Sequence, residues 1–166
     1  MRMYMNKQML PWWGDLRMAV AKYAMLPVRL LVGYGFLTHG LAKWSKGPAA
    51  FATILHTAGV PAPQLMSWVT IATEIIGGVA ILLGAFVSWV SIPAIILMVV
   101  AIFTVHLPYG FTSIKLMSIS NGRAQFGPPG YECDLLYIVC FAALAIHAPT
   151  PWSFDAHRLR RDRDGL

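Results

Sequence analysis

Charged residues are scarce in this sequence: they fill 12% of its 166 positions, whereas hydrophobic residues fill 57%. A soluble domain commonly devotes about a quarter of its residues to charged side chains. A soluble protein of this length needs more polar surface than so few charges provide. The composition therefore excludes an ordinary soluble protein and predicts an integral membrane protein of a length that suits one domain.

Cysteine is also rare, with only Cys133 and Cys140 present. On one helix, a separation of seven residues places their Cα atoms about 10 Å apart, beyond disulfide reach within one chain. We interpret both as reduced packing residues and keep a redox pair or a metal site as the alternative. The sequence also lacks a haem-attachment motif, a GxGxxG fingerprint and iron–sulfur cysteine spacing, so any electrons have to come from a partner.

The sequence does contain long apolar runs. Four of them cover residues 24–42, 66–86, 89–107 and 132–149, and each is close to the length of about 20 residues that crosses a bilayer as a helix. No cleavage site precedes the first run, so we expect an uncleaved span. The predicted fold class is an all-α, integral membrane four-helix bundle with short interfacial helices. Small residues in the first two spans favour close helix packing; they are Gly33, Gly35, Gly77, Gly78 and Gly84.

The segments between the apolar runs differ in character. The stretch "FVSW" at residues 86–89 is a short, uncharged connection. Residues 51–58 predict a helix that lies at the membrane surface. Residues 107–131 are rich in Gly, Pro, Ser and aromatic side chains and predict an ordered loop. Before the first span, Trp12 and Trp13 are expected to anchor an interfacial segment.

The distribution of Lys and Arg predicts the orientation in the membrane. The net charge of +6 does not indicate nucleic-acid binding, because no pattern of interleaved aromatic and basic residues accompanies it. Eight basic residues lie with the two termini and four lie on the longer connections. This excess places both termini in the cytoplasm. The eight are Arg2, Lys7, Arg17, Lys22, Arg158, Arg160, Arg161 and Arg163; the four are Lys43, Lys46, Lys115 and Arg123.

One carboxylate interrupts the apolar run "TIATEIIGGVAILLG" at residues 70–84. Glu74 is the only acidic residue between Asp15 and Glu132, and an ionisable group inside a span is costly and commonly functional. We count depth in the membrane at about 1.5 Å per residue from Lys43 and Met66, taken as markers of the outer interface. On this scale Glu74 lies between Arg29 and His39, so a pair with Arg29 or His39 is expected.

Two interpretations of these polar groups stay open. In the first, Arg29 and Glu74 are a buried charge pair that fixes helix register. In the second, Arg29, His39, Glu74 and His106 line a cavity and relay protons to a lipophilic molecule. Two His and a carboxylate could also bind a metal, but no HxxxH or ExxH spacing is present, so we expect no metal site.

Five stretches together resemble the DoxX family of small four-helix membrane proteins. They are "RLLVGYGFLTHGLAK", "FATILHTAGVPAP", "EIIGGVAILLG", "MVVAIFTVHLPYGF" and "GYECDLLYIVCFAALAI", in the family's order and spacing over about residues 26–155. The family's final Gly-Pro-Gly-x-x-Ser-x-Asp element is degenerate here: "HAPTPWSFD" keeps Ser153 and Asp155 but loses the glycines. The chain therefore lacks the glycine turn of this element, and no function that requires the turn is expected.

The resemblance implies a membrane subunit linked to quinone redox chemistry, with a quinone as its non-covalent cofactor. If the chain takes part in catalysis, the resemblance implies that it does so only as a membrane subunit of a quinone-dependent oxidoreductase. The expected location is the bacterial inner membrane. A soluble or membrane redox partner and a homo-oligomer are both compatible with it. The alternatives are a non-enzymatic scaffold and a small-molecule binding or transport module.

The resemblance also assigns residues and segments. His39, Glu74 and His106 are the expected proton-handling residues. The expected domain organisation is a cytoplasmic or interfacial segment at 1–23, a four-span domain at 24–155 and a basic cytoplasmic tail at 156–166. The positions that match the family's polar residues, and that are expected to bind the ligand, are Arg29, His39, Lys43, Glu74, His106 and Glu132.

Overall fold

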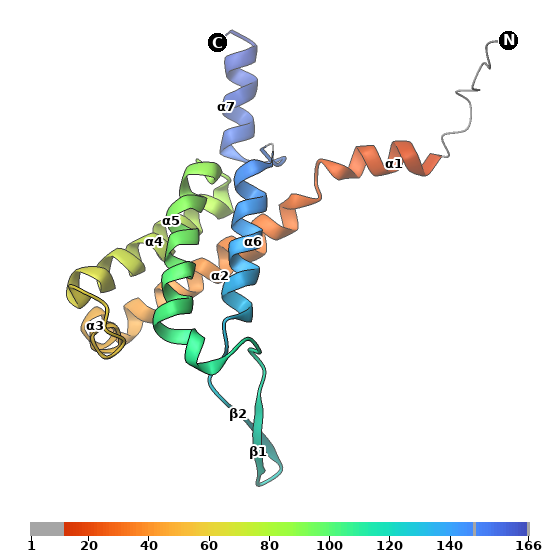
Figure 1. Ribbon diagram of the computed structural model, residues 1–166. Helices are drawn as coiled ribbons and strands as arrows, with labels where there is room; N and C mark the ends of the chain where they lie inside the picture. The colour runs from red at the N-terminus through yellow and green to blue at the C-terminus, as the bar shows by residue number, and fades with distance from the viewer. Residues whose placement is uncertain (1–11, 148, 166) are drawn as a thin grey trace, which may run out of the picture.

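A computed structural model describes residues 12–147 and 149–165, and it is mostly helical (Figure 1). The predicted all-α membrane fold is therefore confirmed. The helices are α1 (Trp12–Ala21), α2 (Met25–Lys46), α3 (Pro48–Thr57), α4 (Pro63–Leu83), α5 (Val87–Ala101), α6 (Glu132–Ile146) and α7 (Phe154–Arg163). A π-helix, η1 (Ile102–His106), and a 3₁₀ turn, η2 (Leu107–Tyr109), continue α5; strands β1 (Leu116–Ser120) and β2 (Arg123–Phe126) follow.

Three of the four predicted spans are confirmed as helices long and apolar enough to cross a membrane. They cover Ala19–Lys46, Pro63–Leu83 and Val87–Tyr109 among the described residues. The fourth, α6, is shorter than predicted, with 15 residues, because the backbone becomes extended at His147. It still runs antiparallel to α5: His106 contacts Asp134 at one end, and the Ser88 hydroxyl donates to the Ala145 carbonyl at the other.

Close packing of α2 on α4 depends on glycine, as the sequence predicts. A Cβ atom at Gly78 would lie 2.6 Å from the backbone nitrogen of Leu37, and one at Gly33 would lie 2.9 Å from that of Leu82. At Gly40 it would lie 2.9 Å from the Cβ of Glu74. Small residues of this kind let membrane helices approach until their backbones are in van der Waals contact. The glycines therefore fix which residues of the two helices lie at the same level.

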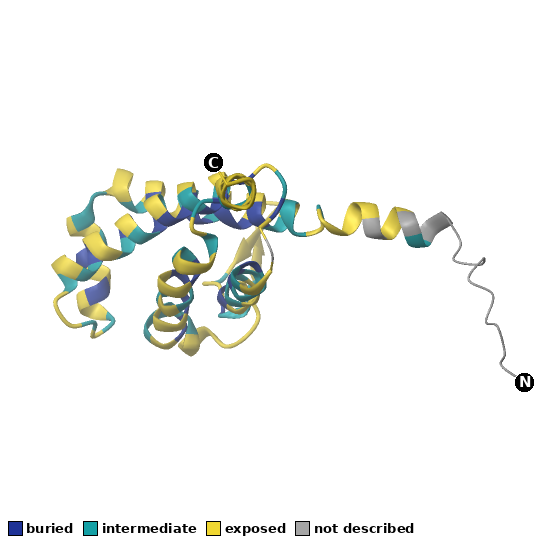
Figure 2. Cartoon of the chain, turned by 90° about the horizontal axis from the view of Figure 1, so that it is seen from above, coloured by how far each residue is buried: buried dark blue, intermediate teal, exposed yellow. Residues whose placement is uncertain are grey.

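The second helix pair, α5 and α6, joins the first pair through an apolar core. Phe36 of α2 meets Phe141 of α6 edge to face, with ring centroids 5.0 Å apart. The buried positions lie between the helices, while the outward faces are exposed (Figure 2). Exposed large apolar side chains on those faces suit contact with lipid. The remaining core residues are Val32, Ile81, Ala94, Met98 and Leu144.

The connections place different structures at the two ends of the bundle. The helix predicted over residues 51–58 is present as α3, and the Ser67 hydroxyl donates to the Pro48 carbonyl at its start. The predicted loop contains a β-hairpin, which turns at Asn121 and Gly122 with φ of 51° and 71°. The hairpin and α3 lie at one end, and α7 and α1 at the other (Figure 1). The side chains of Trp12 and Trp13 lie outside the described part of the chain.

Adding one methyl group at Gly78 should separate α2 from α4. Gly78→Ala is expected to lower the free energy of unfolding by about 1–3 kcal/mol, because the new Cβ meets rigid backbone. Unfolding by SDS titration of the protein in mixed micelles measures this change. The neighbouring Gly77→Ala is the matched control, because its Cβ would meet the end of the Val90 side chain at 3.3 Å. Equal losses in both variants would contradict this packing.

Candidate functional site

Glu74 pairs with Lys43 in the interface between α2 and α4. Only 1% of Glu74 is exposed, and the Lys43 ammonium donates to its Oε1 atom. The ammonium also lies 5.2 Å from the centroid of the Phe51 ring of α3. The other carboxylate oxygen, Oε2, is buried and has no hydrogen-bond partner among the described residues.

The predicted pair between Arg29 and Glu74 is wrong. The two helices are antiparallel, and their glycine contacts place Glu74 at the level of Gly40. Arg29 therefore lies level with the end of α4 near Gly84, roughly 15 Å along the helix from Glu74 at 1.5 Å per residue. The prediction assumed that Lys43 and Met66 lie at the same depth in the membrane. That assumption placed α4 at the wrong position along its axis relative to α2.

His39 lies beside the Lys43–Glu74 pair on α2. Its side chain is exposed, and the next residue, Gly40, lies against Glu74. Its ring meets that of Tyr137 on α6 at right angles, with centroids 6.3 Å apart. Tyr137 was not predicted as a site residue. Its position one turn after Asp134 on the same helix, with a polar group in an apolar run, is the signal that could have identified it.

His106 forms a second polar pair at the same end of the bundle. Its Nδ1 atom lies 2.5 Å from Oδ2 of Asp134, and Asp134 is buried. His106 is the last residue of η1, and π-helical turns occur frequently at functional sites. The sequence favoured Glu132 over Asp134. Glu132 instead accepts a hydrogen bond from the Ser113 amide at 3.0 Å, so it holds the loop before α6.

Four helices therefore contribute to one polar cluster, which we define as His39, Lys43, Glu74, His106, Asp134 and Tyr137. Lys43 and His39 come from α2, Glu74 from α4, His106 from η1 after α5, and Asp134 and Tyr137 from α6. The cluster consists of two pairs, Lys43–Glu74 and His106–Asp134, and of the ring contact between His39 and Tyr137. Among the described residues no group of three or more His, Cys, Asp or Glu side chains could hold a metal ion.

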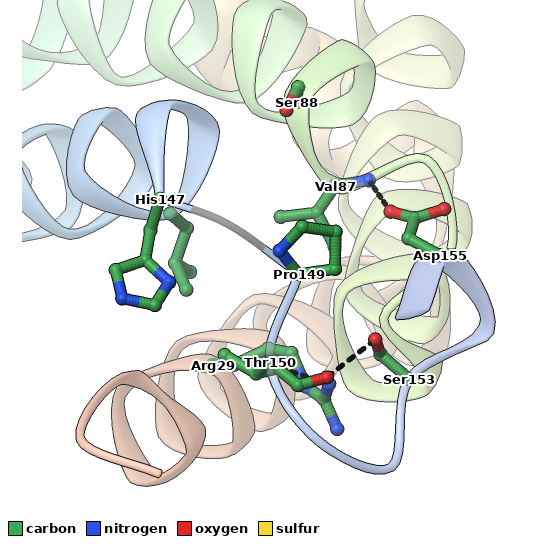
Figure 3. Close-up of a pocket in the computed structure, with 9 residues that line it drawn as sticks. Arg29, Val87, Ser88, His147, Pro149, Thr150, Ser153 and Asp155 are labelled. Carbon is green, nitrogen blue, oxygen red and sulfur yellow. Dashed lines mark hydrogen bonds between the residues drawn. The ribbon is translucent and has the colours of Figure 1, made fainter. Parts of the chain in front are cut away.

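Arg29 belongs to a separate site, where the segment after α6 returns to the bundle (Figure 3). Its guanidinium donates to the Thr150 hydroxyl at 2.5 Å and to the Trp152 carbonyl at 3.1 Å. The Ser153 hydroxyl donates to the Thr150 carbonyl at 2.7 Å. Thr150 stands where the DoxX pattern has its second glycine. The departure from that pattern therefore supplies an acceptor for Arg29, which a glycine side chain could not do.

Asp155 closes the turn between α4 and α5. Its carboxylate accepts hydrogen bonds from the backbone amides of Phe86 at 2.8 Å and Val87 at 3.0 Å. These amides begin α5 and have no partner within the helix. A cavity of about 50 Å³ lies beside them, with room for more than one water molecule. Its lining residues include Arg29, Ser88, His147, Thr150, Ser153 and Asp155.

The comparisons with known proteins show the family of the chain. The model of the DoxX family matches residues 24–107, which is half of the chain. The chain belongs to the DoxX family. It is also similar to the uncharacterized membrane protein Rv3486 of Mycobacterium tuberculosis (strain ATCC 25618 / H37Rv), at 32% identity over 159 residues and 91% of each chain. No solved structure matches it.

The DoxX match divides the residues of the two sites. Arg29, His39, Lys43, Glu74 and His106 lie within the matched segment. Their partners on α6 and after it, including Asp134 and Asp155, lie beyond the segment. The predicted family resemblance is therefore confirmed, and this DoxX protein completes both of its sites with the last part of the chain.

Removing the Asp155 carboxylate should destabilise the start of α5. Asp155→Ala is expected to lower the free energy of unfolding by about 0.5–2 kcal/mol, which is the usual cost of losing a helix cap. The measurement is SDS-induced unfolding in micelles. Asp162→Ala on α7 is the control, because that side chain is 65% exposed and its ion pair with Arg158 is long, at 4.0 Å. A loss in the control as large as in Asp155→Ala would refute the cap.

Proposed function

We propose that this DoxX protein is a membrane subunit that binds the head group of a quinone at its polar cluster and exchanges protons with it. The observation that carries the proposal is the Glu74 carboxylate, which is buried inside the bundle with one oxygen unpartnered. An unsatisfied acceptor at such a position is costly. A ligand that brings a donor, such as the hydroxyl of a quinol, would satisfy it.

Access to the cluster supports the same proposal. His39 faces α6, because its ring contacts Tyr137, and its side chain is nevertheless exposed. A molecule dissolved in the bilayer could therefore reach His39 between α2 and α6 without crossing water. Glu74 contacts α2 at Gly40, the residue that follows His39. This order of groups suits transfer of a proton between a lipophilic ligand and a buried carboxylate.

The chemistry of a quinone fits these groups. Each quinone carbonyl accepts a hydrogen bond, and reduction to the quinol requires protons along with electrons. His39 and Lys43 are donors, and Glu74 and the His106–Asp134 pair can hold or release a proton. The sequence contains no motif for an electron carrier, so the proposal requires a soluble or membrane redox partner that supplies or removes the electrons.

The proposal places the protein in the inner membrane of a bacterium with both termini in the cytoplasm. The described termini lie at the same end of the bundle, opposite the hairpin (Figure 1). The excess of Lys and Arg with the termini supports the cytoplasmic side for that end. The polar cluster would then lie near the outer face.

A scaffold is the second candidate function, and the hairpin favours it. All nine residues of β1 and β2 are exposed, including the large apolar side chains of Leu116, Ile119 and Phe126. A two-stranded hairpin is marginally stable alone in water, so a protein partner at this end of the bundle would stabilise it. A scaffold has no need of a ligand at Glu74.

Organic extracts of purified protein distinguish the two functions. We expect mass spectrometry to find a quinone enriched in extracts of the wild type and lost from Glu74→Gln, because the single amide oxygen stays with Lys43 and an NH₂ group replaces the free acceptor. Asp162→Asn makes the same chemical change on exposed α7 and should keep the quinone. All three proteins must elute alike in size-exclusion chromatography. Equal lipid extracts from all three would contradict quinone binding and favour the scaffold.

A further inference from the structure

We infer that the Tyr137 hydroxyl is the group that donates a hydrogen bond to a carbonyl oxygen of the bound ligand. The inference rests on the proposed function and adds a binding residue that the sequence did not indicate. It concerns the wall of the polar cluster formed by α6, opposite His39.

The Tyr137 ring is held on three sides by other rings. Its centroid lies 6.2 Å from that of Phe36, 6.0 Å from that of Phe141 and 6.3 Å from that of His39. Phe36 and Phe141 are both buried in the core. Because packing fixes the ring, the position of the hydroxyl is fixed too, and a preorganised donor binds a ligand without a further ordering cost.

Gly35 makes room for this hydroxyl on α2. A Cβ atom built at Gly35 would overlap the Tyr137 oxygen, which is the nearest atom to it. Gly35 thus has a different role from Gly33, Gly40 and Gly78, which admit α4. The hydroxyl of an α6 residue reaches the backbone of α2 only because position 35 has no side chain.

The hydroxyl has no hydrogen-bond partner among the described residues. A tyrosine hydroxyl in protein surroundings usually finds one. The Tyr137 ring contacts that of His39, and the His39 side chain is exposed. A free donor on α6 and an unpartnered carboxylate oxygen on α4 therefore lie against α2, the first at Gly35 and the second at the level of Gly40.

These groups select the chemical class of the ligand. The Lys43–Glu74 pair has no net charge and so offers an ion little attraction, whereas a neutral carbonyl accepts a hydrogen bond from a phenol at little electrostatic cost. The rings of Tyr137 and His39 suit contact with a flat, apolar ring. The ligand is therefore a neutral ring that carries a carbonyl oxygen, and the quinone of the proposed function belongs to this class.

The test uses the full chain in lipid nanodiscs and a short-chain ubiquinone labelled with ¹³C at its carbonyls. Tyr137→Phe removes only the hydroxyl and leaves an aromatic ring among aromatic rings. It should raise the Kd for the quinone about tenfold, as loss of one good hydrogen bond does. In infrared difference spectra, the labelled carbonyl band should shift to higher frequency, because the carbonyl loses its donor.

Tyr34→Phe is the matched control, because Tyr34 lies on α2 with 62% of its surface exposed on the outer face of the bundle. Its Kd and carbonyl band should equal those of the wild type. If Tyr137→Phe binds with the wild-type Kd and band, the inference about Tyr137 is overturned while quinone binding stands. If the wild type binds no quinone, the proposed function and this inference are both overturned.

Discussion

The buried ion pair between Lys43 and Glu74 is the interaction on which the rest of the structure depends. A lone carboxylate inside the bundle would cost several kcal/mol or more through lost hydration. Lys43 reduces that cost only if α2 and α4 are in one register, and the glycines at 33, 40 and 78 permit the close approach that this register needs. Charge pairing and backbone packing thus specify the same alignment of the two helices.

This alignment separates two polar sites that the bundle holds at opposite ends. Near α3 and the hairpin, the polar cluster collects donors and acceptors from four helices. Near the termini, Arg29 and Asp155 fasten the segment after α6 to α2 and to the turn before α5. Apolar core residues such as Phe36 and Ile81 lie between the two sites. The contacts of the terminal site hold the chain together, and the chemistry that we propose belongs to the cluster near the hairpin.

The apolar runs and the lone carboxylate were visible in the sequence because membrane spans and buried charges are rare, strong signals. The partner of Glu74 was not, because a depth scale counted from span ends cannot detect how far one helix slides along another. Only the contacts of Gly40 and Gly78 fix that offset. The hairpin was missed although Asn121-Gly122 is a typical hairpin turn, since its strands lack a buried face. Asp155 was noticed only through the family pattern, and its contacts with Phe86 and Val87 join residues far apart in sequence.

The measurement that tests this account most directly is a double-mutant cycle on Lys43→Met and Glu74→Leu, read as the free energy of unfolding in SDS titrations. Lys43→Met should lose about 3–5 kcal/mol, because it leaves the buried Glu74 charge unpaired. Glu74→Leu should lose less, because the Lys43 side chain is 26% exposed, and the double variant should lose clearly less than the sum of the two. The same cycle with Arg29→Met in place of Lys43→Met should be additive. Additive losses for Lys43 and Glu74, or coupling of Glu74 to Arg29, would contradict the register on which the site is built.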